Sequence, residues 1–253
     1  TINVISAAID STGIIHIAMG TWRYWPGAAH IFYATYNTNT DAWGAQVTII
    51  TGTHITHNSY FGTSLSLDSN DIPHIVAIYG YRILGTDYTE IFYTNRIGGS
   101  WKPEISLTGG EIAGNWDFRI FLSIDMDNLP FVMYWGDVDY HVCIGDANDA
   151  TAFTEHTIAV ASFVFCAGPS IAIDTDGNHF MTNYDNSVST IYLWKHLRAD
   201  PWTTWAVYSS VFATEIYDVS IAIDGLNVYC FYAVDYGAGF RNGISTYIGG
   251  VWT

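Results

Sequence analysis

A short sequence pattern occurs five times in this chain and constrains its fold more than any other feature. Each copy has Ala or Ser, then Ile or Leu, then Asp, with Gly, Asn or Asp three positions after that Asp. The five aspartates are Asp10, Asp68, Asp125, Asp174 and Asp224. Successive aspartates are 58, 57, 49 and 50 residues apart, so the sequence predicts five repeats of about 50 residues.

The same order of predicted strands recurs inside each repeat. An apolar strand leads into the Asp turn, whose Asp-x-x-Gly/Asn chemistry is typical of a hairpin with a positive φ. A second strand, a variable loop and a third strand follow, and an aromatic residue then opens the fourth strand. Those aromatics are Trp43, Trp101, Phe153 and Trp205. Four short antiparallel strands per repeat are typical of a β-propeller blade, and no segment has the period of a helix.

We therefore predict an all-β fold, a five-bladed β-propeller of four-stranded antiparallel blades. Residues 1–253 would form a single domain, with approximate blades at 1–52, 62–108, 119–160, 168–212 and 218–253. The sequence stops at Trp252 and Thr253, where the fourth strand of the last blade should begin. The last blade is accordingly expected to have three strands or to be completed from outside the chain.

The recurring aspartates are interpreted as structural residues. Their carboxylates should accept hydrogen bonds from the backbone N–H groups of their own turns. His16, His74 and His179 recur on the second strand, six, six and five residues after the Asp. We interpret them as packed side chains, because repetition puts them in separate blades. The turn at Asp174 begins like a calcium loop but lacks a Glu at its twelfth position. No metal and no cofactor are predicted.

Two segments near the predicted third hairpins match each other at Gly, Gly and Trp. They are Thr94-NRIGGS-Trp101 and Ser245-TYIGGV-Trp252. Their form resembles a degenerate Asp-box, the turn repeated in sialidase-type (BNR-repeat) β-propellers, although the Asp of the box is absent from both. The resemblance covers all five repeats as architecture and is motif-specific in two. It implies a secreted or surface-exposed propeller that handles carbohydrate, and it carries over no activity.

Charge and composition exclude several partners. The chain has 24 Asp+Glu against 8 Lys+Arg, a formal net charge of −16, so nucleic acid and anionic membrane surfaces are poor partners. The longest apolar run, 158–168, is about half of what a spanning helix needs, so no membrane insertion is expected. Three cysteines without CxxC spacing are interpreted as small buried hydrophobes. The start at Thr1, without Met or a cleavable segment, favours a processed piece of a larger polypeptide or assembly.

The variable loops between the second and third strands, and those between blades, are rich in aromatics. In a propeller these loops share one face. Flat rings beside Arg, Asp and Asn suit sugar recognition, and aromatics with Arg also dominate protein-binding hot spots. The predicted ligand-binding residues are Trp22, Arg23, Tyr24, Trp25, Tyr79, Tyr81, Arg82, Trp116, Arg119, Tyr134, Trp135, Tyr236 and Arg241. The competing interpretation is that these rings pack between blades.

An enzyme would need two or three carboxylates at one end of the axis. Glu111 and Glu215 are the acid candidates, with Asp117 as a partner, and no Arg-Ile-Pro segment of the sialidase type occurs. The sequence thus favours an extracellular binding module, lectin-like or adhesin, that recognises a glycan or cell-surface ligand. The alternatives are a glycoside-processing enzyme and a structural domain of a surface filament or virion. A prokaryotic or viral origin is favoured.

Overall fold

The computed structural model describes most of the chain. Outside the described part lie residues 1, 24–28, 53–58, 84–85, 109–111, 114–119, 136–139, 148–149, 159–165, 186–189, 202–203, 212–215, 225–226, 236–239, 249–250 and 253, and some strand residues are described by their backbone alone. The described residues form strands and no helix, and hence no helix that could span a membrane. This confirms the all-β prediction.

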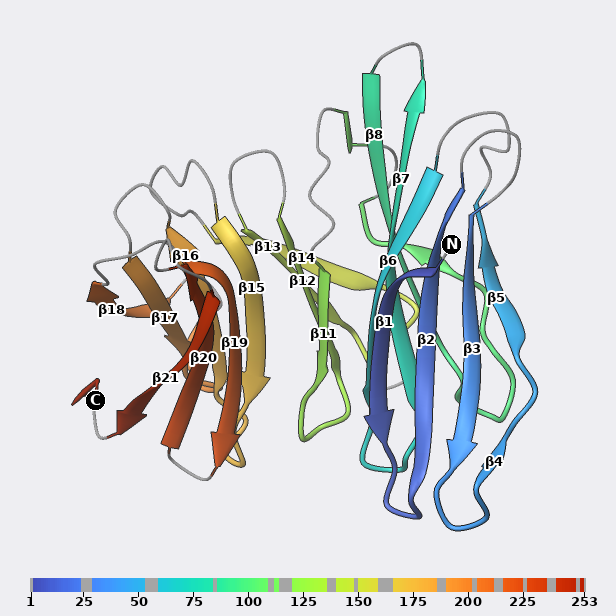
Figure 1. Cartoon of the computed structure of the whole chain (residues 1–253), viewed down its shortest axis with the longest axis horizontal. Helices are drawn as coiled ribbons and strands as arrows, with labels where there is room; N and C mark the ends of the chain where they lie inside the picture. The colour runs from blue at the N-terminus through green and yellow to red at the C-terminus, as the bar shows by residue number, and fades with distance from the viewer. Residues whose placement is uncertain are drawn as a thin grey trace. The chain divides into compact units, whose positions relative to one another are not determined.

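The strands follow the five repeats, and we number the repeats as blades 1 to 5 (Figure 1). Blade 1 has β1 (Ile2–Ile9), β2 (Ile14–Arg23), β3 (His30–Asn37), β4 (Ala42–Trp43) and β5 (Val47–Thr51). Blade 2 has β6 (Ser59–Leu67), β7 (Pro73–Ile83), β8 (Thr86–Asn95), β9 (Ile105–Ser106) and β10 (Ile112–Ala113).

The last three blades each have four strands. Blade 3 has β11 (Ile120–Ile124), β12 (Pro130–Trp135), β13 (Tyr140–Gly145) and β14 (Phe153–Ile158). Blade 4 has β15 (Cys166–Ile173), β16 (His179–Asp185), β17 (Thr190–His196) and β18 (Ala206–Val211). Blade 5 has β19 (Ile216–Asp224), β20 (Asn227–Asp235), β21 (Phe240–Ile248) and β22 (Val251–Trp252).

Blades 3, 4 and 5 are separate antiparallel sheets whose strands lie in chain order. Blade 5 has its own fourth strand, because Val251 and Trp252 pair with Ile248 and Tyr247. The expectation of a three-stranded last blade is therefore wrong: two residues are enough to form the outer pairing. Blades 1 and 2 depart from the predicted separation, because the end of β2 pairs with the start of β6 and joins them in one ten-stranded sheet.

The chain divides into two compact units. The first contains residues 1–137 and 141–155, and thus blades 1 and 2 and most of blade 3. The second contains residues 138–140 and 156–253, and thus blades 4 and 5. The assignment of residues 1–253 to one domain, with the blade limits given above, stays a prediction.

The turn between the first two strands of a blade is held by its aspartate. Oδ1 of Asp10 accepts hydrogen bonds from the backbone N–H groups of Thr12 at 2.9 Å and Ile14 at 2.8 Å. The same pair of bonds, at 2.7–2.9 Å, occurs at Asp68, Asp125 and Asp174. The predicted structural role of these four aspartates is confirmed.

The residue three positions after the aspartate has a positive φ in the same four blades. The φ angles are 86° at Gly13, 62° at Asp71, 63° at Asn128 and 80° at Gly177. The two side chains at such positions also link blades. Oδ1 of Asp71 accepts the Ser11 N–H at 3.1 Å, and Oδ1 of Asn128 accepts the Ser69 N–H at 2.8 Å. Those contacts compensate the strain of a non-glycine residue in this region of backbone space.

A serine four residues before the aspartate fastens each blade to the next within a unit. Oγ of Ser6 accepts the Leu65 N–H at 2.9 Å, and Oγ of Ser64 accepts the Leu122 N–H at 3.1 Å. In the second unit, Oγ of Ser170 accepts the Ile221 N–H at 3.2 Å. The repeated serine thus supplies a hydrogen bond between the first strands of neighbouring blades.

Apolar packing on both faces of β7 completes the first unit. Side chains alternate between the faces of a strand. The odd-numbered residues of 75–81 belong to a core cluster with Ile31 of blade 1. Val76 and Ile78 belong to another cluster with Val132 of blade 3. A strand buried on both faces needs an almost continuous apolar sequence, and the second strand of repeat two has one.

Replacing Ser64 by Ala tests the link between blades 2 and 3. The N–H of Leu122, a residue only 7% exposed, would lose its partner, which should lower the free energy of unfolding by about 1–3 kcal/mol. The matched control is Ser66→Ala on the same strand, where three other repeats carry Ala, and it should change stability by less than about 0.5 kcal/mol. Denaturant unfolding measures both. Equal effects of the two substitutions would contradict the role given to Ser64.

Candidate functional site

The second strands of blades 1 and 2 are longer than the sequence suggests, that of blade 3 ends where expected, and these ends decide where the predicted binding residues lie. β2 runs to Arg23, β7 to Ile83 and β12 to Trp135. Residues expected in loops therefore occupy strand ends. These ends lie opposite the Asp turns within each blade, because each second strand begins at its turn.

Backbone pairing fixes several of these positions. Trp22 and Arg23 pair with Tyr60 and Ser59 of β6. Arg82 pairs with Asp87 near the hairpin between β7 and β8, and Arg241 pairs with Val234 in blade 5. The side chains of Trp22, Arg23, Arg82, Trp135 and Arg241 lie outside the described part of the structure. So do Tyr24, Trp25, Trp116, Arg119 and Tyr236, and the acid candidates Glu111, Asp117 and Glu215.

Three of the predicted rings are buried instead of exposed. Tyr79 and Tyr81 are 0% exposed and Tyr134 is 2% exposed. Tyr79 and Tyr81 lie two residues apart on β7 and so share the face that packs on blade 1. The expectation that these three rings are presented by loops is corrected, because the strands extend past them and neighbouring blades cover them.

Tyr134 belongs to a polar group that the sequence did not reveal. Its hydroxyl donates to Oε1 of Glu155 at 2.6 Å, and Nδ1 of His141 lies 2.6 Å from the same oxygen. The His141 ring stacks on Tyr134 with centroids 5.0 Å apart. Burial, followed by the bond to Glu155, raises the pKa of Tyr134 well above its usual value. Tyr134 is therefore buried and keeps its proton at neutral pH, so it cannot serve as an accessible nucleophile.

Blades 1 and 2 each contain an Asp–His–Tyr group. In blade 1, Nε2 of His16 lies 3.2 Å from Oδ2 of Asp10, and Nδ1 lies 2.6 Å from the Tyr33 hydroxyl. In blade 2, Nδ1 of His74 lies 2.6 Å from the Tyr93 hydroxyl, and Nε2 lies 3.8 Å from Oδ2 of Asp68. The two groups repeat and are largely buried, in agreement with the packing role predicted for His16 and His74.

His179 does not occupy the equivalent position, because it lies five residues after its aspartate and His16 lies six residues after its own. His16 pairs with Ala8 across the hairpin, two residues before the aspartate. In blade 4 the corresponding partner, Ala172, pairs with Phe180, so His179 lies on the opposite face of its sheet. Its ring lies near that of His196, with centroids 5.9 Å apart. The described residues contain no cluster of three or more His, Cys, Asp or Glu that could hold a metal ion.

A polar hollow lies where blade 1 meets the third hairpin of blade 2. It has a volume of about 450 Å³, and its lining includes Tyr33, Thr35, Val47, Arg96, Ser100 and Trp101. We call it the Arg96 hollow. The hairpin is one of the two degenerate Asp-box segments. Its Gly98 and Gly99 have φ of 82° and 85°, and the Gly99 N–H donates to the Arg96 carbonyl at 3.0 Å.

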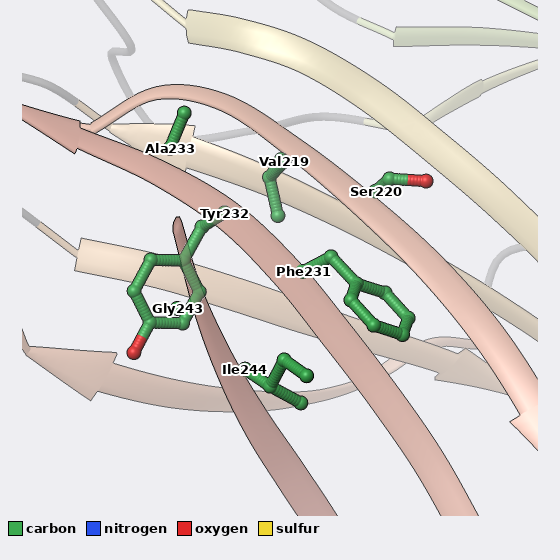
Figure 2. Close-up of a pocket in the computed structure, with 7 residues that line it drawn as sticks. All are labelled: Val219, Ser220, Phe231, Tyr232, Ala233, Gly243 and Ile244. Atoms are coloured by element: carbon green, nitrogen blue, oxygen red, sulfur yellow. The ribbon is translucent and has the colours of Figure 1, made fainter. Parts of the chain in front are cut away.

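A second hollow, of about 360 Å³, lies on blade 5 and is mostly apolar (Figure 2). Ser220, Phe231 and Ile244 lie in line across three paired strands. Phe231 is 41% exposed and Ile244 is 61% exposed. Ile221, the neighbour of Ser220, packs on blade 4 instead, so this hollow lies on the other face of blade 5. No charged residue lines this hollow, so we interpret it as an exposed apolar face of the blade and not as a polar ligand site.

Two of the three cysteines are buried and free. Burial raises the pKa of Cys143 and of Cys230 to about 12. Such thiols are unreactive at neutral pH, as expected for small apolar core residues. The side chain of Cys166 lies outside the described part.

No protein-family model matches the sequence, and no match was found among curated proteins. Solved structures match the fold. A protein of unknown function from Dyadobacter fermentans aligns with 95% of this chain and 77% of its own, with a TM-score of 0.65 and 11% identity. The endosialidase of phage phi92 aligns with 98% of this chain and 54% of its own, with a TM-score of 0.62 and 12% identity.

A polysaccharide lyase of family PL25, an ulvan lyase, aligns with 96% of this chain and 63% of its own, with a TM-score of 0.62 and 11% identity. The chain therefore spans less than two thirds of either enzyme. The likeness confirms a multi-bladed β-propeller and the resemblance to sialidase-type propellers as architecture. The Asp-box motif itself stays a prediction.

Because His74 and His179 are buried, we expect the free energy of unfolding to fall on mild acidification. Burial lowers the pKa of His74 to about 4, partly offset by Asp68, and burial lowers that of His179 to about 3. An unfolded histidine has a pKa of about 6.5, so the unfolded chain takes up protons first as the pH falls. Stability from this source is complete above about pH 6.5 and declines toward about pH 4, by up to about 1.4 kcal/mol per pH unit for each histidine.

Denaturant unfolding of the wild type and of His74→Gln, across this range, measures the effect. The variant should lose stability less steeply. Asp10 titrates below this pH range. Burial alone would raise its pKa, but hydrogen bonds from its turn lower the pKa to about 2. Its contribution is present above about pH 4 and is lost only as the pH falls toward about 2. An unchanged slope in His74→Gln would contradict the neutral, buried state of His74.

Proposed function

We propose that this chain is an extracellular carbohydrate-binding β-propeller, a lectin-like or adhesin module. The observation that carries the proposal is the position of Trp and Arg residues at one end of the blades. Trp22 and Arg23 end β2, Arg82 lies next to the end of β7, and Trp135 ends β12. All three strand ends lie opposite the Asp turns of their own blades.

Side chains at this end have the composition that sugars require. A flat ring can cover the C–H face of a sugar, and Arg can bind hydroxyl or carboxylate oxygens with a fixed fork of donors. Strand ends also hold such groups more rigidly than loops, which lowers the ordering cost of binding. The net charge of −16 disfavours nucleic acid as the partner.

The structural neighbours support the same class of ligand. Two of them are an endosialidase and an ulvan lyase, and both names denote action on carbohydrate polymers. These neighbours also favour the second candidate, a glycoside-processing enzyme, for which Glu111, Asp117 and Glu215 remain the acid candidates. Incubation with the polysaccharide that binds best separates the two: a binding module leaves it intact, and an enzyme shortens it.

A glycan array identifies the ligand, and Trp22→Ala then tests the surface. Loss of a central aromatic contact should weaken binding by about 1–3 kcal/mol, or roughly five-fold to more than a hundred-fold, with little change in melting temperature. The matched control is Trp43→Ala in the same blade, because Trp43 is 67% exposed and lies on the outer strand β4. The control should bind as the wild type does. Unchanged affinity in Trp22→Ala together with a large drop in melting temperature would refute the binding role of this residue.

A further inference from the structure

Arg96 is a cation with unused donors inside a hollow. It is exposed, and its Nε–H donates to the Gly99 carbonyl at 3.2 Å. Among the described residues, no carboxylate is ion-paired with it, although the chain has 24 Asp+Glu. A guanidinium has five N–H donors, so its terminal nitrogens keep donors for another group.

The Asp–His–Tyr group of blade 1 fixes the wall opposite this cation. A carboxylate only accepts hydrogen bonds, so Nε2–H of His16 donates to Asp10. Nδ1 of His16 lies 2.6 Å from the Tyr33 hydroxyl and holds it. The Tyr33 hydroxyl is thus engaged with His16, and Tyr33 lines the hollow together with Arg96.

The remaining lining suits a sugar ring. Trp101 is half-buried and packs edge-on against Tyr33, with ring centroids 4.9 Å apart. Thr35 and Ser100 add hydroxyl groups, and Val47, 40% exposed, adds apolar surface. The volume of about 450 Å³ lies within the usual range of small-molecule sites.

The junction of blades 2 and 3 has the same contact between a tyrosine and an aromatic ring. There Tyr93 is 0% exposed and Phe153 takes the position of Trp101, with ring centroids 4.9 Å apart. The Tyr93 hydroxyl is approached by the Asn95 amide at 3.4 Å, and Asn95 is 1% exposed. Asn95 lies on the same strand as Tyr93 and corresponds to Thr35 of blade 1, because His74 pairs with Asn95 as His16 pairs with Thr35. Asn95 is buried beside its tyrosine, whereas Thr35 lines the Arg96 hollow.

We propose that the Arg96 hollow is a second ligand site, which binds a carboxylate-bearing sugar unit. The guanidinium would pair with the carboxylate through its terminal N–H groups, and Trp101 would cover part of the ring. This site lies by the third hairpin of blade 2, and Arg96 directly follows the end of β8 at Asn95, which pairs with His74 near the Asp turn. It is therefore separate from the strand ends of the proposed function and does not depend on them.

Titration of the protein with glucuronate, followed by the NMR signals of Arg96 Nε–H and Trp101 Nε1–H, tests the site. Both signals should shift and saturate with glucuronate. Glucose, which lacks the charge, and acetate, which lacks the ring, should each bind at least about ten-fold more weakly. Arg96→Gln should weaken glucuronate binding at least ten-fold, and Arg96→Lys should rescue it only in part because Lys cannot bind a carboxylate with two parallel bonds.

Arg198→Gln is the matched control, because it removes the same charge from an exposed residue that follows the third strand of blade 4. It should bind glucuronate as the wild type does. Equal binding by Arg96→Gln and wild type, or equal binding of glucose and glucuronate, would overturn the proposal. Equal losses in the Arg96 and Arg198 variants would also overturn it, since they would indicate a general charge effect. Trp22→Ala should retain glucuronate binding at this site, which separates a failure here from a failure of the proposed function.

Discussion

Hydrogen bonds from backbone N–H groups to side-chain oxygens hold this fold together at the places where strand pairing cannot. In four blades an aspartate Oδ1 accepts two N–H groups and closes the first hairpin. At three junctions a serine Oγ accepts an N–H from the neighbouring blade. Within a unit, the first strands of adjacent blades lie next to each other without a backbone ladder, so these serines satisfy groups that burial would otherwise leave unpaired. The rest of each blade can then pack face to face through apolar side chains.

Such a scaffold separates structural from functional positions. The polar residues that recur from blade to blade serve the turns and the junctions. Residues that differ between blades are not needed for these shared hydrogen bonds, so they are available to bind a ligand. Thr35 and Asn95 show the difference: they occupy equivalent positions, yet Thr35 lines the Arg96 hollow and Asn95 is 1% exposed beside Tyr93. Ligand sites on this protein are accordingly expected where one blade departs from the pattern of its neighbours.

The sequence predicted what depends on local chemistry. The Asp turns, their positive-φ residues and the strand order of each repeat follow from a few adjacent residues. What depends on pairing between distant segments could not be predicted in the same way. β2 continues to Arg23 because β6 pairs with its end, and Tyr79 is buried because blade 1 covers β7. The face of His179, by contrast, follows from sequence spacing: its hairpin has the same register as that of blade 1, but His179 lies five residues after its aspartate and His16 lies six. Arg96 and Tyr33 line one hollow from two blades, and sequence spacing does not indicate that they meet there.

Amide hydrogen exchange at Leu65, Leu122 and Ile221 is the most direct test of this account. These three N–H groups are the donors to the serines at the blade junctions. If the serines hold neighbouring blades together, the three amides should exchange as slowly as the paired amides in the middle of β7, with rates that report opening of the whole unit. Exchange as fast as that of an exposed turn amide would show that the junctions are open to water and would contradict the account.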